Sequence, residues 1–314
     1  MTSRKLPSSN DAMAAAITRA ASKQTYYTIH FLADRGLVQD AYRAYAYFRW
    51  VDDWLDGPGR DQAECLAFVN RQHMLVDQCY RGEQLRGLAD EEDMLVDLIS
   101  GDRGKSGSLQ SYIRNMMAVM AFDAGRRGRL VSREELANYT RWLAVAVTEA
   151  MHHFIGHNCP SPRGNTRYLA VSAAHITHML RDTLEDVGAG YFNIPREFLD
   201  SQGVQPWDVN SEAYRAWVRR RVQLARVYFD AGRESLAQVV NARCRLASLA
   251  YMARFETVLD LIERDGYCLR REYPERRSPG YILRMGWSVL SRAVTSPRQE
   301  KLPRVFANQI ESER

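Results

Sequence analysis

Apolar residues recur at intervals of three or four positions along most of the chain, and runs of alternating apolar and polar residues are scarce. The first spacing is typical of one face of an α-helix, whereas strict alternation is typical of a strand. Breakers such as Gly57-Pro58-Gly59 separate the helical stretches. The pattern therefore predicts an all-α protein, with helices at residues 12–34, 37–56, 61–80, 88–100, 108–127, 132–157, 165–188, 211–240, 242–266 and 278–295.

No linker-like segment and no repeat of fixed period divides the 314 residues. We therefore expect one helical domain spanning residues 1–314, with residues 1–11 and about 297–314 flexible because they are polar. Ser132 followed by Glu135 is a capping-box signature at the point where the helix at 132–157 is predicted to begin. Facing helices in such a bundle can build a central site.

Charge and cysteine content exclude several classes of protein. The 43 basic and 38 acidic residues give a net charge of +5 that is spread along the chain, so we expect no nucleic-acid partner. Five widely spaced cysteines without a Cys-x-x-Cys pair fit a reducing, cytoplasmic location better than a disulfide framework. No apolar run approaches the roughly 18 residues that span a bilayer, so we expect at most peripheral membrane contact.

Two acidic clusters carry the candidate chemistry. Asp52 and Asp56 are four residues apart, so they share one face of a helix, and Arg49 lies on the same face. Asp182 and Asp186 repeat this spacing, with Arg181 beside the first aspartate and His178 one turn earlier. Both clusters interrupt apolar helical stretches, where a charge needs a partner or a metal.

Two facing carboxylate pairs suit Mg²⁺, which prefers oxygen ligands and often binds together with substrate phosphates. The alternative is that each cluster is a solvated helix face, with Arg49 and Arg181 as ion-pair partners. Because two matching clusters occur, each with a nearby arginine, we favour a metal–diphosphate site. Its predicted metal ligands are Asp52, Asp56, Asp182 and Asp186.

The segments around the clusters resemble the squalene/phytoene synthase family. Tyr45 to Asp56 resembles the first aspartate-rich motif with its leading arginine, and Leu180 to Asp186, followed by Gly190 and Ile194-Pro195, resembles the second. The resemblance covers roughly residues 20–295. Weaker echoes occur at Ser22-Lys23, Tyr26-Tyr27, Phe122-Asp123, Glu135 through Tyr139, Tyr251 through Asp260 and Gly266-Tyr267.

The resemblance implies an isoprenoid-synthase-type helical bundle with a central cavity and a Mg²⁺-dependent prenyltransferase activity that ionises an allylic prenyl diphosphate. Metal and arginine would stabilise the departing negative charge, and an apolar pocket would keep water from the carbocation. The residues implied are Arg49, Asp52, Asp56, Asp182 and Asp186 in catalysis, with Asp53 and Glu185 as helpers, Lys23, Arg49 and Arg181 in diphosphate binding, and Arg141, Tyr251 and Met120 in the pocket.

The chain departs from the family pattern at His175 and His178, where the family carries glutamine and asparagine. Imidazole has a pKa near 6.5 and could serve as an acid or base in catalysis, although packing is the alternative role. These changes slightly favour a non-standard acceptor, such as a small aromatic compound, over head-to-head coupling of two prenyl diphosphates, which remains the alternative.

Five of the seven histidines lie between His152 and His178, which leaves two further alternatives open. One is a transition-metal enzyme built in a helical bundle. The other is a non-catalytic relative that keeps the fold alone.

Overall fold

The chain forms eleven α-helices within the part that the structure, a computed structural model, describes: residues 9–102, 107–157, 159 and 164–277. No β-strand occurs in these ranges, where the nearest equivalent is an isolated bridge between Val131 and Pro195. The all-α prediction is confirmed. The helices are α1 (Ser9–Ala21), α2 (Lys23–Leu32), α3 (Val38–Leu55), α4 (Gln62–Arg81), α5 (Asp90–Asp102), α6 (Gly107–Arg126), α7 (Arg133–Ile155), α8 (Leu169–Ala189), α9 (Arg196–Gln202), α10 (Glu212–Ala237) and α11 (Ala242–Arg264).

The predicted helix at 12–34 was wrong in one respect, because the structure divides it at Ser22. This residue is extended, with φ −152° and ψ 100°, and its hydroxyl accepts a hydrogen bond of 3.2 Å from the Thr25 N–H. Serine competes with the helix for backbone hydrogen bonds, which makes it a cap rather than an interior residue. The short helix α9 was not predicted, and the predicted helix at 278–295 lies outside the described residues.

Local capping explains where several helices begin. The predicted capping box is confirmed at the start of α7, where the Ser132 hydroxyl accepts from the Glu135 N–H at 3.1 Å and the Glu135 carboxylate accepts from the Ser132 N–H at 2.7 Å. Asp61 and Glu64 form the same reciprocal pair before α4. Each box satisfies two N–H groups that the helix itself leaves unpaired.

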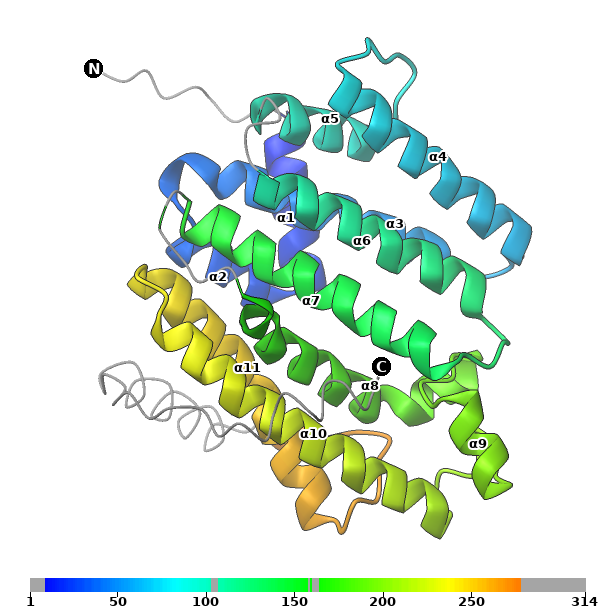
Figure 1. The fold of residues 1–314 in the computed structure, drawn as a ribbon. Helices are drawn as coiled ribbons and strands as arrows, with labels where there is room; N and C mark the ends of the chain where they lie inside the picture. Colours follow the sequence, from blue (N-terminus) through cyan, green and yellow to red (C-terminus); the bar gives the residue numbers. More distant parts are fainter. Residues whose placement is uncertain (1–8, 103–106, 158, 160–163, 278–314) are drawn as a thin grey trace.

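The long helices lie side by side in the order α4, α6, α7, α8 and α10 in Figure 1, and neighbours in this series pack against each other. Helix α3 packs on α1, α5 and α6, while α11 packs on α7, α8 and α10. Side chains from almost every helix join one buried apolar core. None of the described helices combines the length and apolar character needed to cross a membrane.

Two glycines bring backbone segments into close contact. A Cβ atom placed on Gly232 of α10 would lie 2.7 Å from the Cβ of Ala170, so the missing side chain lets α10 approach α8. Gly190 ends α8 in the left-handed conformation, at φ 86°, and its carbonyl accepts a hydrogen bond of 2.8 Å from the Gly128 N–H. The end of α8 is therefore tied through main-chain atoms to the turn between α6 and α7.

Candidate functional site

The first aspartate motif occupies the last turn and a half of α3. The Arg49 Nη1 lies 3.2 Å from the Asp52 Oδ2, and the same guanidinium contacts Asp53. Burial, reinforced by the nearby carboxylates of Asp56 and Asp123, raises the pKa of Asp52 to about 6 even though Arg49 opposes the shift. Arg49 therefore forms ion pairs with aspartates of the first motif, as expected if this motif were a solvated helix face. It does not, however, neutralise the whole cluster of carboxylates.

The second motif lies near the end of α8, and its two aspartates have different environments. Burial favours the neutral form of Asp182, but hydrogen bonds from Arg181 and from the His178 Nε2, at 2.9 Å, outweigh it and hold the pKa of Asp182 below its usual range. Burial and the charge of Asp182 raise the pKa of Asp186 to about 7. Asp182 is therefore stabilised in its ionised form by neighbouring donors, whereas the net effect at Asp186 favours the neutral form.

A buried polar network connects this second motif to α6 and α7. The Arg126 guanidinium, only 6% exposed, donates to Asp123 at 2.7 Å and to the Asn193 Oδ1 at 2.8 Å. Tyr139 donates to the other Asp123 oxygen at 2.9 Å, and the Asn193 Nδ2 donates to Asp186 at 2.6 Å. The network is thus continuous from Tyr139 to Asp186 through four hydrogen bonds.

The same network lies within electrostatic reach of the first motif. Asp56 contributes to raising the pKa of Asp123, whose main cause is burial, and Asp123 contributes to raising the pKa of Asp52. Arg126 opposes the rise at Asp186. The two motifs, which are about 130 residues apart in the sequence, therefore lie around one buried cluster of charges.

A second group of residues places positive charge beside the second motif. Arg254 of α11 is half-buried, and its Nη1 donates to the Gln24 Oε1 at 3.1 Å. Burial, followed by repulsion from Arg181, lowers the pKa of Arg254, and Asp182 opposes that shift. Burial raises the pKa of Tyr251, one turn earlier on α11, to about 12. Arg181 of α8 and Arg254 of α11 thus lie near Asp182, where their positive charges can neutralise a bound anion.

The other predicted site residues occupy three different environments. Lys23 is exposed at the start of α2, next to the Gln24 that Arg254 contacts, and Met120 is buried in the core at 5% exposure. Tyr251 lines a small cavity of about 20 Å³ between α7, α8, α10 and α11. Arg141 is exposed, contacts Asn138 at 3.4 Å and lines neither described cavity, so it takes no part in the site proposed below.

His175 and His178 point to different surroundings on α8. His175 is 3% exposed, and its ring lies edge-on to Tyr139 with centroids 4.8 Å apart. Its Nδ1 has no hydrogen-bond partner among the described residues, and burial holds the pKa of His175 well below its usual range, so the ring is neutral. His178 is half-exposed and contacts Asp182. Only His178 therefore touches an aspartate of the motifs.

Within the described residues, no three histidine, cysteine, aspartate or glutamate side chains are arranged to hold a metal ion. The transition-metal alternative therefore gains no support. The aspartates instead form pairs, and burial, followed by the charge of the neighbouring aspartate, raises the pKa values of Asp52 and Asp186. Such a donor set fits Mg²⁺, which commonly binds through one or two carboxylates and completes its shell with water and substrate phosphates.

Sequence reasoning missed four residues of this site as functional candidates: Arg126, Tyr139, Asn193 and Arg254. A local signal existed for Arg126, which lies three residues after Asp123 on one helix face. Arg254 follows Tyr251 by the same spacing in an apolar helix. Asn193 lies in a connecting segment, and no local pattern indicates its contact with Asp186.

Comparison with known proteins finds similarity to squalene and phytoene synthases. The profile of the family described as "Squalene/phytoene synthase" matches residues 18–278. A chloroplastic phytoene synthase 2 from Solanum lycopersicum is 23% identical over 271 residues, which cover 82% of this chain and 83% of that protein. A chloroplastic phytoene synthase 3 from Zea mays is 24% identical over 233 residues, and the match spans 71% of this chain but only 52% of that protein.

A crystal structure of a squalene synthase from Alicyclobacillus acidocaldarius has the same fold, with a TM-score of 0.64 at 17% identity over 83% of this chain and 95% of that one. The bundle is therefore of the isoprenoid-synthase type, as predicted. Because the family profile covers well over half of the sequence, the chain belongs to the squalene/phytoene synthase family, a family of prenyltransferases.

Proposed function

We propose that this protein is a Mg²⁺-dependent prenyltransferase that ionises an allylic prenyl diphosphate and joins the prenyl group to a second prenyl diphosphate. The slight preference for an aromatic acceptor, drawn above from His175 and His178, is not supported, since the relatives found are phytoene and squalene synthases. The observation that carries the proposal is the convergence of two incompletely neutralised aspartate pairs on one buried charge network.

Asp52 on α3, Asp56 at its C-terminal cap, and Asp182 and Asp186 on α8 would hold the metal. When bound, Mg²⁺ supplies positive charge that stabilises the diphosphate as it leaves. The raised pKa of Asp186, about 7, results partly from the neighbouring charge of Asp182. A cation between such carboxylates would favour their ionised forms, so this pair has the charge balance of a cation site.

Arginines complete the diphosphate site in this proposal. Arg49 and Arg181 lie against the aspartates of their own motifs, and Arg254 lies near Arg181 on the neighbouring helix. Guanidinium groups bind phosphate oxygens through paired N–H donors. Once diphosphate enters, these cations would share their charge between the carboxylates and the leaving group, which lowers the cost of breaking the carbon–oxygen bond.

The neutral His175 beside Tyr139 supports no role as a cation or a strong base, whereas His178 has its Nε2 on Asp182. His178 would therefore orient Asp182 for metal binding. Its second ring nitrogen remains the one group by which it could accept a proton during product formation.

The test is diphosphate release with Mg²⁺ and C5, C10, C15 or C20 allylic diphosphates, with products identified by mass spectrometry. We expect coupled hydrocarbon or alcohol from one of these substrates alone. Asp52→Asn and Asp182→Asn should each lower diphosphate release by at least 100-fold, on the order of the loss of an electrostatic group. Asp77→Asn, which removes a half-exposed carboxylate on α4, is the control and should keep activity.

Wild-type turnover in both motif variants would refute the site assignment, whereas no turnover of any of these substrates by the wild-type protein would revive the non-catalytic alternative. Diphosphate release without a coupled product would preserve the ionising site and refute the second prenyl diphosphate as acceptor. Products that appear only when a small aromatic compound is added would restore the alternative acceptor.

A further inference from the structure

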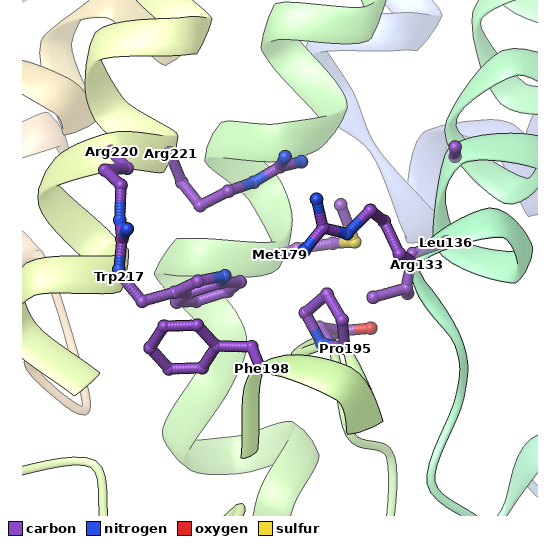
Figure 2. A pocket seen from close by; sticks show the side chains of 10 residues that line it. Arg133, Leu136, Met179, Pro195, Phe198, Trp217, Arg220 and Arg221 are labelled. Carbon is purple, nitrogen blue, oxygen red and sulfur yellow. The ribbon is translucent and has the colours of Figure 1, made fainter. Parts of the chain in front are cut away.

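A cavity of about 200 Å³ lies between α7, α8, α9 and α10. We call it the arginine pocket, and Figure 2 shows the side chains that line it. Its defining residues are Arg133, Asn193, Phe198, Trp217, Arg220 and Arg221. None of the proposed metal ligands and none of the diphosphate-binding arginines lines it.

Among the residues that the structure describes, the lining carries three arginines and no acidic side chain. In Figure 2, Arg133 and Arg221 extend toward each other from α7 and α10, and Arg220 lies at the edge beside Trp217. Within the described part of the chain, neither Arg133 nor Arg220 has a carboxylate within ion-pair distance. The nearby Glu197 instead accepts a hydrogen bond of 3.0 Å from the Arg133 main-chain N–H. The pocket therefore has an excess of positive charge.

The remaining surface of the pocket is apolar and partly aromatic. Trp217 and Phe198 are 7% and 9% exposed, and their ring centroids are 6.4 Å apart. The Arg220 guanidinium lies 5.5 Å from the centroid of the Phe198 ring. The volume is below the roughly 300–1,000 Å³ of sites for drug-sized ligands, so the occupant must be small. Flat rings pack well against such aromatic walls.

We propose that the arginine pocket binds a small aromatic carboxylate, whose ring packs against Trp217 and Phe198 and whose carboxylate lies beside the Arg133 guanidinium, with Arg220 and Arg221 adding positive charge to the pocket. Arginine matches a carboxylate through two parallel N–H donors, and the ring supplies the apolar area. A free inorganic anion would leave the aromatic walls unused, and an aromatic cation would be repelled.

Asn193 lines this pocket and also belongs to the network around the second motif. Its Oδ1 accepts from Arg126 and its Nδ2 donates to Asp186, so both polar ends of the side chain are engaged by the network. The arginine pocket therefore adjoins the proposed metal site but shares none of its proposed ligands, and ligand binding there does not require prenyltransferase activity.

The test is isothermal titration of the purified full-length protein with benzoate, compared with acetate, inorganic phosphate and benzylamine. We expect saturable binding of benzoate, at least tenfold weaker binding of acetate and phosphate, and no binding of benzylamine. Arg133→Gln should weaken benzoate binding about tenfold, the effect of one charged hydrogen bond, and Arg220→Gln, which removes charge at the edge of the pocket, should weaken it less. Arg215→Gln, on the exposed side of α10, is the matched control and should leave it unchanged.

A further variant, Arg49→Gln, distinguishes the two compartments, because benzoate bound at the aspartate motifs would be lost in this variant and retained in Arg133→Gln. That result would overturn the proposal, as would phosphate binding as tight as benzoate or the absence of saturable binding at millimolar benzoate. Circular dichroism of each variant verifies that lost binding does not reflect unfolding. Failure of the prenyltransferase assay would not affect any of these outcomes.

Discussion

Replacing Arg126 by leucine should destabilise the protein strongly, because Arg126 is the buried centre of the network that joins α6, α7 and the segment after α8. The change removes its hydrogen bonds to Asp123 and Asn193 and leaves the Asp123 carboxylate without its cation. It also removes the guanidinium from beside three aromatic rings, at 4.9 to 5.4 Å from their centroids. Leaving one buried charge unpaired costs about 3–5 kcal/mol, a large part of a total stability of about 5–15 kcal/mol.

The assay is urea unfolding at pH 7.5 followed by circular dichroism. Arg129→Leu is the matched control. Arg129 forms an ion pair of 2.7 Å with Glu135, and the two side chains are 45% and 37% exposed. Such a surface ion pair should contribute only about 0–1 kcal/mol to the free energy of unfolding. Adding Asp123→Asn to Arg126→Leu removes the unpaired charge and should restore part of the loss. If Arg126→Leu unfolds at the same urea concentration as Arg129→Leu, the network does not hold these helices together.

Three further predictions follow from single residues. Arg254→Gln should raise KM for the prenyl diphosphate about 10–100-fold with a smaller effect on stability, since a charged hydrogen bond contributes about 1.5–3 kcal/mol; an unchanged KM in steady-state kinetics would remove Arg254 from the site. Burial lowers the pKa of His153 to about 4, so the folded state favours the neutral form of this side chain. The resulting contribution to the free energy of unfolding is fully present above the unfolded pKa of about 6.5. It is lost as the pH falls toward 4. Urea midpoints should therefore drop between these pH values, and the drop should be smaller in His153→Gln; equal drops would contradict the assignment. Gly232→Ala should destabilise by about 1–3 kcal/mol because its Cβ would meet Ala170 at 2.7 Å, whereas Gly188→Ala, whose Cβ would meet nothing within 4 Å, should stabilise α8 by about 0.5–1 kcal/mol in thermal melts.

The local parts of the site were predictable from the sequence. A spacing of four residues places Asp52 with Asp56, and Asp182 with Asp186, on shared helix faces whatever the tertiary structure. Helix positions followed from apolar spacing for the same reason. The break at Ser22 was missed because the apolar pattern continues across it, and only the cap hydrogen bond interrupts the helix.

The long-range parts of the site were not predictable from one sequence. Gln24 and Arg254 are 230 positions apart, and no local pattern indicates that α2 and α11 meet. Arg141 is exposed and contacts Asn138 at 3.4 Å, so its place in the substrate pocket stays a prediction.

The main-chain hydrogen bond from Gly128 to Gly190 has a consequence for how this site can diverge. Both residues have positive φ, 73° at Gly128 and 86° at Gly190, so a residue with a side chain at either position strains the backbone that makes the link. A change in loop length would shift the donor past its acceptor and release the end of α8 that carries Asp186. The two turns are therefore constrained both in their number of residues and at these two glycines, because the position of Asp186 depends on a link between main-chain atoms.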